Sequence, residues 1–569
     1  MSAETEVFDY VIVGAGAAGC VVANRLAAAE ACTVCLLEAG PPDYSVFLRI
    51  PAGVYKASSI PKYAWQFETE PSPATANRAI PIPQGKTLGG STAINGMNYN
   101  RGHYEDFDGW ARRGNRGWAY ADVLPYFKRT ERRIGTCDTR YRGLEGALPI
   151  TDCDWQHPLC DSFIEAAHNL GLPHNSDYNG ASQAGVGYYQ RYIENGWRVS
   201  AARAFLRPIT TKRNLEIRTR AQAIAVVFEG KRAIGVRYAQ GPGRPARDLK
   251  ARREVILTAG AANTPKLLQI SGVGPPALLA DLGVPILHEL PGVGANLQDH
   301  YMIHFIVRVK GIKAISGRGL ALLREGAKWV FGRPSVLALS PSLVYGFANS
   351  RDLSSTPDIQ LDLSIGNYSN HTLESFPVLK PGFYQLRPKS TGFVRACSPD
   401  PFRAPIIQPN YLEDERDQRV VVDGIRMVRR LLGAPELQPY YCGEELPGPS
   451  VTDDSECLEY AREAGLTAYH VCGTCQMGPQ DNPASVVDDQ LRVHGLESLR
   501  IADASIMPTV PSANTSAAVF MIAEKAADMI LGRRPLPAII LVPPTGSGVR
   551  LRPPYRRRSR SRGLEVAKR

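Results

Sequence analysis

The sequence predicts an α/β protein, α+β overall, in which a parallel-sheet domain is joined to a second domain built on an antiparallel sheet covered by helices. Three observations support this fold class. Residues 8–40 follow a strand, helix, strand pattern around a glycine turn, residues 301–463 change to alternating segments with helical stretches between them, and residues 499–531 return to the first pattern. A chain of 569 residues is too long for one ordinary core, so two or more domains are expected.

The glycine turn is the most informative feature of the chain. The apolar run Phe8–Val13 leads into Gly14-Ala15-Gly16-Ala17-Ala18-Gly19, and an alanine-rich helix pattern continues to about Ala29. Gly14 permits the tight turn, Gly16 lets the backbone approach a pyrophosphate, and Gly19 lets helix and strand pack closely. The N–H groups and the positive dipole end of the helix would point at the phosphates.

A second apolar run, 33–37, ends at Glu38, whose carboxylate can accept hydrogen bonds from a ribose. Together with the glycine turn it predicts a Rossmann-like unit that binds the ADP-ribose half of a dinucleotide. A glycine-rich turn without a ligand is the alternative. The pattern does not distinguish a nicotinamide from a flavin as the other half of the cofactor.

Further segments add to the first domain. The loop that begins at Gly85 is rich in glycine and hydroxyl side chains, which suits close backbone approach to a flat or charged ligand. Residues 214–240 predict strands with a hairpin at Glu229-Gly230-Lys231. Residues 253–260 predict a strand that leads into a helix, with Asn263 or Thr264 as its cap and Pro265 in its first turn.

The later patterns define the rest of the architecture. Ile359–Leu363 and Gly392–Ala396 alternate as strands of an antiparallel sheet do, and Arg416–Leu432 is helical. The strand pattern Leu499–Ala502, followed by Asp503 and the apolar helix pattern Thr515–Leu531, completes the first domain. We therefore predict a first domain over 6–300 with its glycine loop at 85–103, a substrate domain over 301–463, a return to the first domain over 464–532 and a tail over 533–569.

Charge and cysteine content exclude several classes of function. Residues 550–569 hold nine Lys/Arg and one acid, so the rest of the chain is nearly neutral and gives no argument for nucleic-acid binding. The basic tail is typical of a disordered, solvated segment, with contact to an anionic membrane surface or to RNA as the alternatives.

Eleven scattered cysteines indicate free thiols in a reducing compartment, and neither Cys32/Cys35 nor Cys472/Cys475 has partners at zinc spacing, so no metal is expected. No apolar run approaches the roughly 20 residues of a membrane helix, and the first strand pattern leaves no room for a signal peptide. We expect a cytoplasmic protein, with membrane association through the tail left open.

Residues 6–532 resemble the glucose–methanol–choline (GMC) flavin oxidoreductases. Besides the glycine turn, the resemblance is carried by GKTLGGSTAINGMNYNRG from Gly85, GAANTPKLLQISGVG from Gly260, PGVGANLQDH from Pro291, YHVCGTCQMG from Tyr469 and RIADASIMPTVPSANTS from Arg500. Within the family the pattern is most similar to bacterial choline and aliphatic-alcohol dehydrogenases.

The resemblance implies FAD as the cofactor. Some members link FAD covalently through a histidine of the glycine loop, but this chain has Ala93 and Ile94 there, so noncovalent binding is expected. The implied cofactor-binding residues are Gly14, Gly16, Ala17, Ala18, Gly19, Glu38, Ala39, Thr87, Leu88, Gly90, Asn95, Gly96, Met97, Ala223, Ala259, Asp503, Ala504, Asn514 and Thr515.

The resemblance also implies a catalytic pair, His470 and Asn514. An imidazole can accept the hydroxyl proton of an alcohol as a hydride leaves its carbon, and an amide can hydrogen-bond the substrate oxygen. His300, in the Leu-Gln-Asp-His motif, and His103 are expected to lie outside the chemistry.

The expected reaction is oxidation of a primary alcohol, aliphatic or aromatic, to an aldehyde by hydride transfer to flavin N5, with His470 as the base. The electrons would pass to a quinone, another acceptor or oxygen. Relatives that handle choline often carry a Glu-x-Gly-Gly-Phe run, and the matching run here, Leu343–Phe347, has no carboxylate, which weakens a quaternary ammonium substrate. A flavin lyase without net redox change and an FAD-containing binding protein are the alternatives. The alcohol, the acceptor and the oligomeric state are left open.

Overall fold

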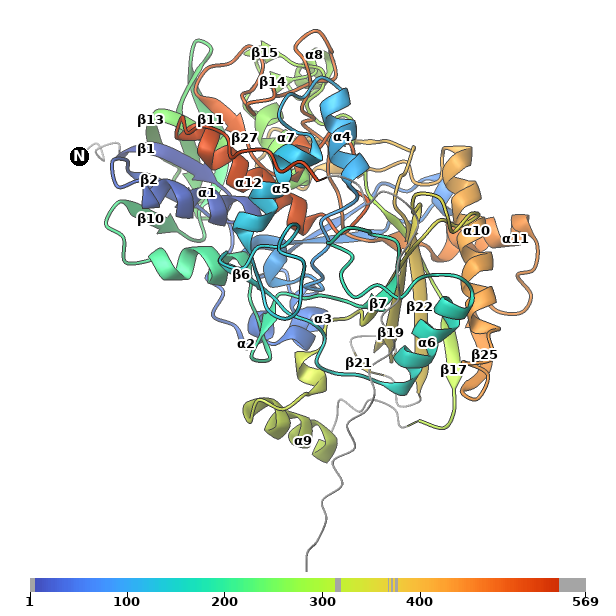
Figure 1. Ribbon diagram of the computed structural model, residues 1–569. Coiled ribbons are helices and arrows are strands. Elements are labelled where there is room, and N and C mark those ends of the chain that lie inside the picture. The colour runs from blue at the N-terminus through green and yellow to red at the C-terminus, as the bar shows by residue number, and fades with distance from the viewer. Residues whose placement is uncertain (1–5, 313–318, 367, 370–371, 374–376, 542–569) are drawn as a thin grey trace, which may run out of the picture.

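Two sheets, each with its own helices, stand side by side in the molecule (Figure 1). The computed structural model describes residues 6–312, 319–366, 368–369, 372–373 and 377–541. Most of the predicted tail, from residue 542 onward, lies outside the described residues. The α/β class predicted from the sequence is confirmed.

The first sheet is the predicted Rossmann-like sheet. Its strands run in the order β10-β2-β1-β13-β12-β11, and β27 pairs with residues 255–257 of β13, beyond the residues 247–250 that pair with β12. The pairs β10–β2, β2–β1, β1–β13 and β13–β27 are parallel, whereas β11–β12 and β12–β13 are antiparallel. The strands are β1 (Glu6–Val13), β2 (Val34–Leu37), β10 (Leu215–Arg218), β11 (Gln222–Glu229), β12 (Arg232–Ala239), β13 (Arg247–Leu257) and β27 (Leu499–Ile501). The hairpin predicted at Gly230 is confirmed.

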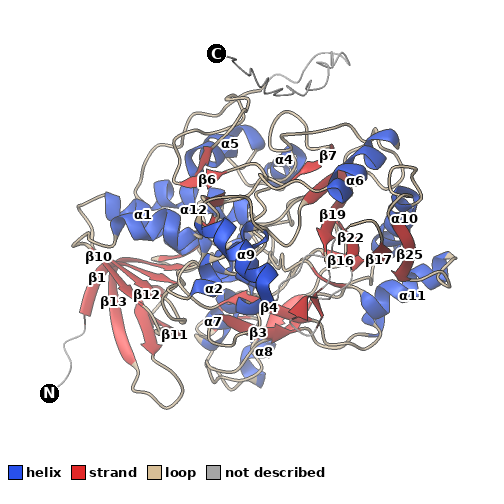
Figure 2. Ribbon diagram, turned by 90° about the horizontal axis from the view of Figure 1, so that it is seen from below, coloured by secondary structure: helices blue, strands red, loops and turns tan. Residues whose placement is uncertain are grey.

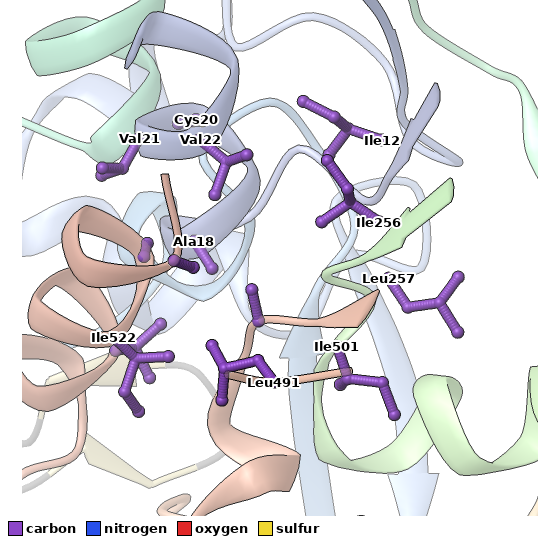
Figure 3. Packing of buried hydrophobic residues seen from close by; sticks show 14 of the residues in the cluster. Ile12, Ala18, Cys20, Val21, Val22, Ile256, Leu257, Leu491, Ile501 and Ile522 are labelled. Atoms are coloured by element: carbon purple, nitrogen blue, oxygen red, sulfur yellow. The ribbon is translucent and has the colours of Figure 1, made fainter. Parts of the chain in front are cut away.

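Helices from both ends of the chain cover one face of this sheet. Helix α1 (Ala17–Ala28) packs against α12 (Ser516–Ile530), and α12 in turn packs against α5 (Tyr120–Thr130). Figure 3 shows apolar side chains of α1 and α12 together with those of β1, β13 and β27, which belong to one buried cluster. Burial of this apolar surface fixes the C-terminal helix beside the N-terminal glycine turn.

The second sheet is antiparallel, as predicted, with the order β25-β17-β22-β19-β18-β7 and with β16 bridging β22 and β26. Helices α6 (Pro158–Asn169), α10 (Glu415–Leu432) and α11 (Asp454–Ala464) share its core on one face. The strands are β7 (Gly185–Tyr188), β16 (Tyr301–His304), β17 (Ile306–Val309), β18 (Val344–Ala348), β19 (Ile359–Ile365), β22 (Val378–Gln385), β25 (Tyr441–Leu446) and β26 (Leu466–Thr467).

Side chains of β19 alternate between the two faces of the second sheet. Leu361 and Leu363 point into the core under the helices, whereas Asp362 and Ser364 line a cavity on the other face. This period of two is what a half-buried strand requires. On this strand the face under the helices is apolar, and the opposite face of the sheet, which also carries aromatic side chains such as Phe347, is turned toward the cavity.

Sheet membership differs from the predicted ranges in three places. Helix α6 and strand β7 belong with the second sheet, although they fall within 6–300, and β26 does so from within 464–532. The predicted strand Gly392–Ala396 forms β23 (Phe393–Arg395), but it pairs only with β24 (Ile406–Gln408) and does not join the large sheet. Short strands carry little pattern of their own, and their partners are chosen by tertiary packing.

The helix after β13 begins earlier than predicted. Helix α7 spans Gly260–Ile270, so Asn263 and Thr264 lie inside it and neither caps it. Asp503 takes the capping role, because its carboxylate accepts hydrogen bonds from Gly260 N and Thr264 Oγ1. Pro265 is tolerated inside the helix since the hydroxyl of Thr474 donates to the carbonyl oxygen of Ala261, at 2.7 Å, in place of the missing N–H.

Smaller elements complete the described chain. The remaining helices are α2 (Val46–Arg49), α3 (Val54–Ala57), α4 (Tyr104–Arg112), α8 (Pro276–Asp281) and α9 (Gly319–Val330). The remaining strand pairs are β3 (Ala64–Glu68) with β4 (Pro81–Gly85), β5 (Glu131–Arg133) with β6 (Leu148–Ile150), β8 (Ile193–Glu194) with β9 (Trp197–Arg198), β14 (Val273–Gly274) with β15 (His288–Glu289), and β20 (Tyr368–Ser369) with β21 (Thr372–Leu373).

The packing of α1 on β1 gives a test of the fold. A Cβ at Gly19 would lie 1.9 Å from the carbonyl oxygen of Gly14, so Gly19→Ala should lower the free energy of unfolding by about 3 kcal/mol or prevent folding. Gly326→Ala is the matched control, because a Cβ there meets nothing within 4 Å and a helical alanine is favoured over glycine. Urea unfolding of both variants checks this, and equal midpoints would contradict it.

Candidate active site

A cavity of about 570 Å³ lies between the two sheets. On one side it is lined by residues at the carboxyl ends of parallel strands: Gly14 after β1, Glu38 after β2, Ala259 after β13 and Asp503 after β27. On the other side it is lined by the face of the second sheet that lies opposite the helices, including Asp362, Lys380 and Tyr384. Ligands of open α/β sheets bind at such an edge of carboxyl strand ends.

Most of the predicted site residues line this cavity. They are Gly14, Gly16, Ala17, Ala18, Glu38, Ala39, Gly90, Asn95, Gly96, Met97, Ala223, Ala259, His470, Asp503, Ala504, Asn514 and Thr515. Gly19, Thr87 and Leu88 do not line it. Gly19 lies in the contact between α1 and the glycine turn, while Thr87 Oγ1 and Leu88 N donate to the carbonyl oxygen of Pro41 and hold the glycine loop against the chain after β2.

The two glycine segments touch each other through their backbones. A Cβ at Gly90, which has φ of +53°, would lie 2.6 Å from Cα of Gly16. Only glycine permits this approach, because the left-handed conformation and the close contact both exclude a side chain. The first turn of α1 opens onto the cavity beside this contact, and Gly16 at its N-cap supplies no side-chain cap. The N–H groups of that turn suit a phosphate anion.

Glu38 holds the glycine turn from the end of β2. Its Oε2 accepts a hydrogen bond from Ala15 N at 3.0 Å and its Oε1 accepts one from Gly40 N at 2.8 Å. Burial nevertheless raises the pKa of Glu38 to about 7, since the desolvation of the carboxylate outweighs these hydrogen bonds. Each oxygen keeps acceptor capacity toward the cavity, which suits the hydroxyl groups of a ribose.

An unpaired polar atom in the cavity wall also fits a bound dinucleotide. Asn98 lines the cavity, and its buried Oδ1 has no hydrogen-bond partner among the described residues. An unpaired buried acceptor of this kind is costly unless a ligand or a water supplies a donor.

His470 and Asn514 meet at the wall shared by the two domains. Nδ2 of Asn514 lies 3.1 Å from Nε2 of His470, and both residues line the cavity. Oδ1 of Asn514 accepts hydrogen bonds from Asn100 Nδ2 at 2.5 Å and from Tyr384 OH at 3.3 Å. These donors fix the amide so that its Nδ2 faces His470.

His300 sets the tautomer of His470. His300 Nε2 lies 3.2 Å from the carbonyl oxygen of Leu386, which can only accept, so Nε2 carries the proton and Nδ1 is an acceptor. Nδ1 of His470 lies 2.9 Å from that acceptor and therefore donates to it. The chain of hydrogen bonds leaves the lone pair of His470 on Nε2, the atom beside Asn514.

Asp299 holds both histidines through the backbone. Its Oδ1 accepts hydrogen bonds from the backbone N–H groups of His300 and His470, and its Oδ2 accepts from Thr467 and Tyr411. Burial raises the pKa of Asp299 to about 6, although these four hydrogen bonds lower it. Burial, and next the neighbouring His300, lower the pKa of His470 well below its ordinary value, so its imidazole is neutral.

Sequence reasoning missed part of this arrangement. His300 was expected to lie outside the chemistry, but its ring contacts the ring of His470, and Asn100 and Tyr384 contact Asn514. The Leu-Gln-Asp-His motif was the available signal, because it places Asp299 directly before His300. Nothing in the sequence pairs Asn100 with a residue more than four hundred positions away. His103, in contrast, caps α4 and does not line the cavity.

Asp362 was also missed. The run Leu343–Phe347 has no carboxylate, and Tyr345 within it is buried with its hydroxyl donating to the carbonyl oxygen of Asn175. The register partner of Tyr345 on β19 is Asp362, which does line the cavity. Its Oδ1 accepts from Tyr189 OH at 3.2 Å and its Oδ2 from Ser342 Oγ at 2.7 Å.

The fold and the cavity define a two-domain dinucleotide-binding enzyme, and comparisons with known proteins identify its family. The family models described as GMC oxidoreductase match residues 8–302 and 388–523. The oxygen-dependent choline dehydrogenase of Chromohalobacter salexigens is 42% identical over 548 residues, which cover 94% of this chain and 97% of that relative. The alcohol dehydrogenase [acceptor] of Pseudomonas putida is 39% identical over 534 residues, 92% of this chain and 96% of that relative.

Solved structures agree. Pyridoxine 4-oxidase from Mesorbium loti has a TM-score of 0.84 at 30% identity, and the match covers 92% of this chain and 99% of that one. A formate oxidase of Aspergillus oryzae has a TM-score of 0.86 at 26% identity, and the match covers 93% of this chain and 99% of that one. The chain belongs to the GMC oxidoreductase family. It is an FAD-dependent oxidoreductase, so the family and the cofactor predicted from the sequence are confirmed.

The raised pKa of Glu38 predicts a pH dependence of stability. The folded protein binds this proton more tightly than the unfolded chain, so the contribution of Glu38 to stability falls as the pH rises from its ordinary value near 4.5 to about 7. We expect the free energy of unfolding of Glu38→Gln, relative to the unsubstituted apoprotein, to rise across this window by an amount on the order of 3 kcal/mol.

Urea unfolding below and above this window measures the change. Glu413→Gln, at an exposed position, is the control and should show no such change. Parallel pH curves for Glu38→Gln and the unsubstituted protein would contradict the prediction.

Proposed function

We propose that this GMC oxidoreductase oxidises a primary alcohol, aliphatic or aromatic, to an aldehyde with noncovalently bound FAD. The observation that carries the proposal is the contact of His470 Nε2 with Asn514 Nδ2 on the wall of a cavity whose other end is a dinucleotide cradle. A base and a hydrogen-bond donor side by side are what the removal of a hydroxyl proton requires.

The cradle supplies the cofactor contacts in this proposal. The first turn of α1 and the Gly16–Gly90 contact would hold the pyrophosphate, and Glu38 would hold the ribose of the adenosine. Ala93 and Ile94 stand in the glycine loop and neither side chain can bond covalently to a flavin, which supports noncovalent binding. When bound, FAD accepts the hydride from the carbinol carbon at flavin N5.

His470 acts as the general base. Its ring is neutral because burial lowers its pKa, and the hydrogen bond to His300 leaves the lone pair on Nε2. Nε2 can therefore take the hydroxyl proton of an alcohol as the C–H bond breaks. Nδ2 of Asn514 donates to the substrate oxygen and holds the hydroxyl against Nε2.

The charges on the cavity wall formed by the second sheet indicate which class of alcohol fits. Asp362 and Lys380 lie on adjacent strands and both line it, so the wall carries both charges, and the oxygens of Asp362 already accept hydrogen bonds. We propose an uncharged primary alcohol rather than a quaternary ammonium alcohol on this ground. The electrons then pass to a quinone, another acceptor or oxygen.

Anaerobic reduction of the flavin tests the reaction and the base together. A primary alcohol should bleach the yellow holoenzyme in the absence of oxygen, and His470→Ala should bleach about 10²–10⁴-fold more slowly while FAD stays bound. His174→Ala, at a half-exposed histidine, is the control and should bleach at the normal rate.

The outcome also separates the alternatives. Bleaching of His470→Ala at the normal rate would remove His470 as the base. A holoenzyme that binds alcohols but is bleached by none of a panel of primary alcohols would instead favour a flavin lyase or a binding protein.

A further inference from the structure

Helix α9 exposes an unusual amount of apolar surface. Leu320 is 84% exposed and Leu323 is 69% exposed, and beyond them Val330 and Phe331 are 73% and 79% exposed. Large apolar side chains gathered in this way on one element mark an interaction site in a water-soluble domain. In Figure 1 the helix projects from the lower end of the molecule.

The opposite side of α9 is fastened to the protein. Trp329 Nε1 donates to the carbonyl oxygen of Gly196 at 2.8 Å, and its ring lies against Trp197 with ring centroids 4.1 Å apart. At the next turn Glu325 accepts a hydrogen bond from Val336 N at 3.1 Å, and its carbonyl oxygen accepts one from Ser335 Oγ at 2.9 Å. The apolar residues therefore point outward because the anchoring residues face the body.

Helix α2 extends the exposed surface. The guanidinium of Arg49 lies 4.5 Å from the ring centroid of Trp197, the same ring that Trp329 contacts, so α2 and α9 flank one tryptophan. Tyr44, Val46 and Phe47 are exposed there. We call residues 44–62 and 319–336 the docking face, and Figure 2, seen from below, shows α9 in front of α2.

The charge of the docking face is one-sided. It contains six basic residues, Arg49, Lys56, Lys62, Arg324, Lys328 and Arg333, and a single acid, Glu325, which pairs with Lys328 at 2.5 Å. Exposed apolar side chains flanked by cations are the features of a helix that lies in the surface of a membrane containing anionic lipids. A protein partner would need a surface that is both apolar and acidic.

The docking face also adjoins the cavity. Helix α3 belongs to it, and Val54 at the start of α3 lines the cavity wall. No helix in the described part of the chain is long and apolar enough to cross a bilayer. Attachment through this face would therefore be peripheral, with the cavity wall close to the lipid surface.

We propose that the docking face binds an anionic lipid bilayer, with α9 lying in the plane of the interface and Leu320, Leu323 and Phe331 inserted among the acyl chains. The surrounding basic residues bind the lipid headgroups. This mode of attachment is independent of the oxidation proposed above and of the basic tail.

Co-sedimentation with vesicles tests the proposal on the full-length holoenzyme. Vesicles of phosphatidylcholine and phosphatidylglycerol in equal parts should bind the protein, and vesicles of phosphatidylcholine alone should bind it less. The variant Leu320→Ser/Leu323→Ser/Phe331→Ser should lose binding about tenfold or more. Ile286→Ser removes an exposed apolar side chain between α8 and β15 and should bind as the unsubstituted protein does. Figure 1 shows α8 and β15 at the end of the molecule opposite α9.

Three further measurements complete the test. Flavin absorbance of the triple variant should be unchanged, which shows that it folds and holds FAD. A chain ending at residue 541 should still bind vesicles, and loss of all binding with the tail would overturn the proposal. Vesicle binding by the triple variant equal to that of the unsubstituted protein would also overturn it. So would a result in which the unsubstituted protein is a dimer and the triple variant is a monomer that binds vesicles equally well.

Discussion

The close backbone contact at the carboxyl edge of the first sheet is the constraint on which the rest of the structure depends. Gly16 and Gly90 touch there, and Gly19 packs on Gly14, so two distant parts of the chain can approach only because side chains are absent. Parallel pairing of β1 with β2 and β13 brings Glu38 and Ala259 to the same edge, and β27 adds Asp503 from the far end of the chain. The proposed cofactor site is a consequence of this convergence.

The return of the chain to the first domain also assembles the wall of the cavity that carries the proposed catalytic pair. Between β26 and α12 the chain contributes His470 and Asn514, while the antiparallel sheet contributes Tyr384 and Gln360 behind them. Leu386, His300 and His470 form a directed series of hydrogen bonds that ends on one nitrogen lone pair. Burial lowers the pKa of both histidines and keeps their rings neutral. The carbonyl oxygen of Leu386 therefore decides that the lone pair of His470 is on Nε2.

The sequence predicted those helices, strands and turns that are determined by a few adjacent residues. The turn at Gly14, the helix that follows it and the hairpin at Gly230 each carry their signal in a few adjacent residues. The start of α7 was mispredicted because its cap, Asp503, lies more than two hundred residues away. The strand β7 was not predicted, and it fell within the range 6–300 because a four-residue strand carries no record of its partner. The contacts of His300, Asn100 and Asp362 are between residues far apart in the sequence, so no local pattern indicates them. Motif resemblance did single out His470 and Asn514, whose side chains the structure brings into contact.

The central claim is that this cavity removes a hydride from an alcohol while His470 takes the proton. Its most direct test is the rate of anaerobic flavin reduction by a primary alcohol compared with the same alcohol deuterated at the carbinol carbon. Breakage of the C–H bond in the reducing step predicts slower bleaching by the deuterated alcohol, with the same final extent of reduction. Alcohol binding without bleaching would contradict the claim.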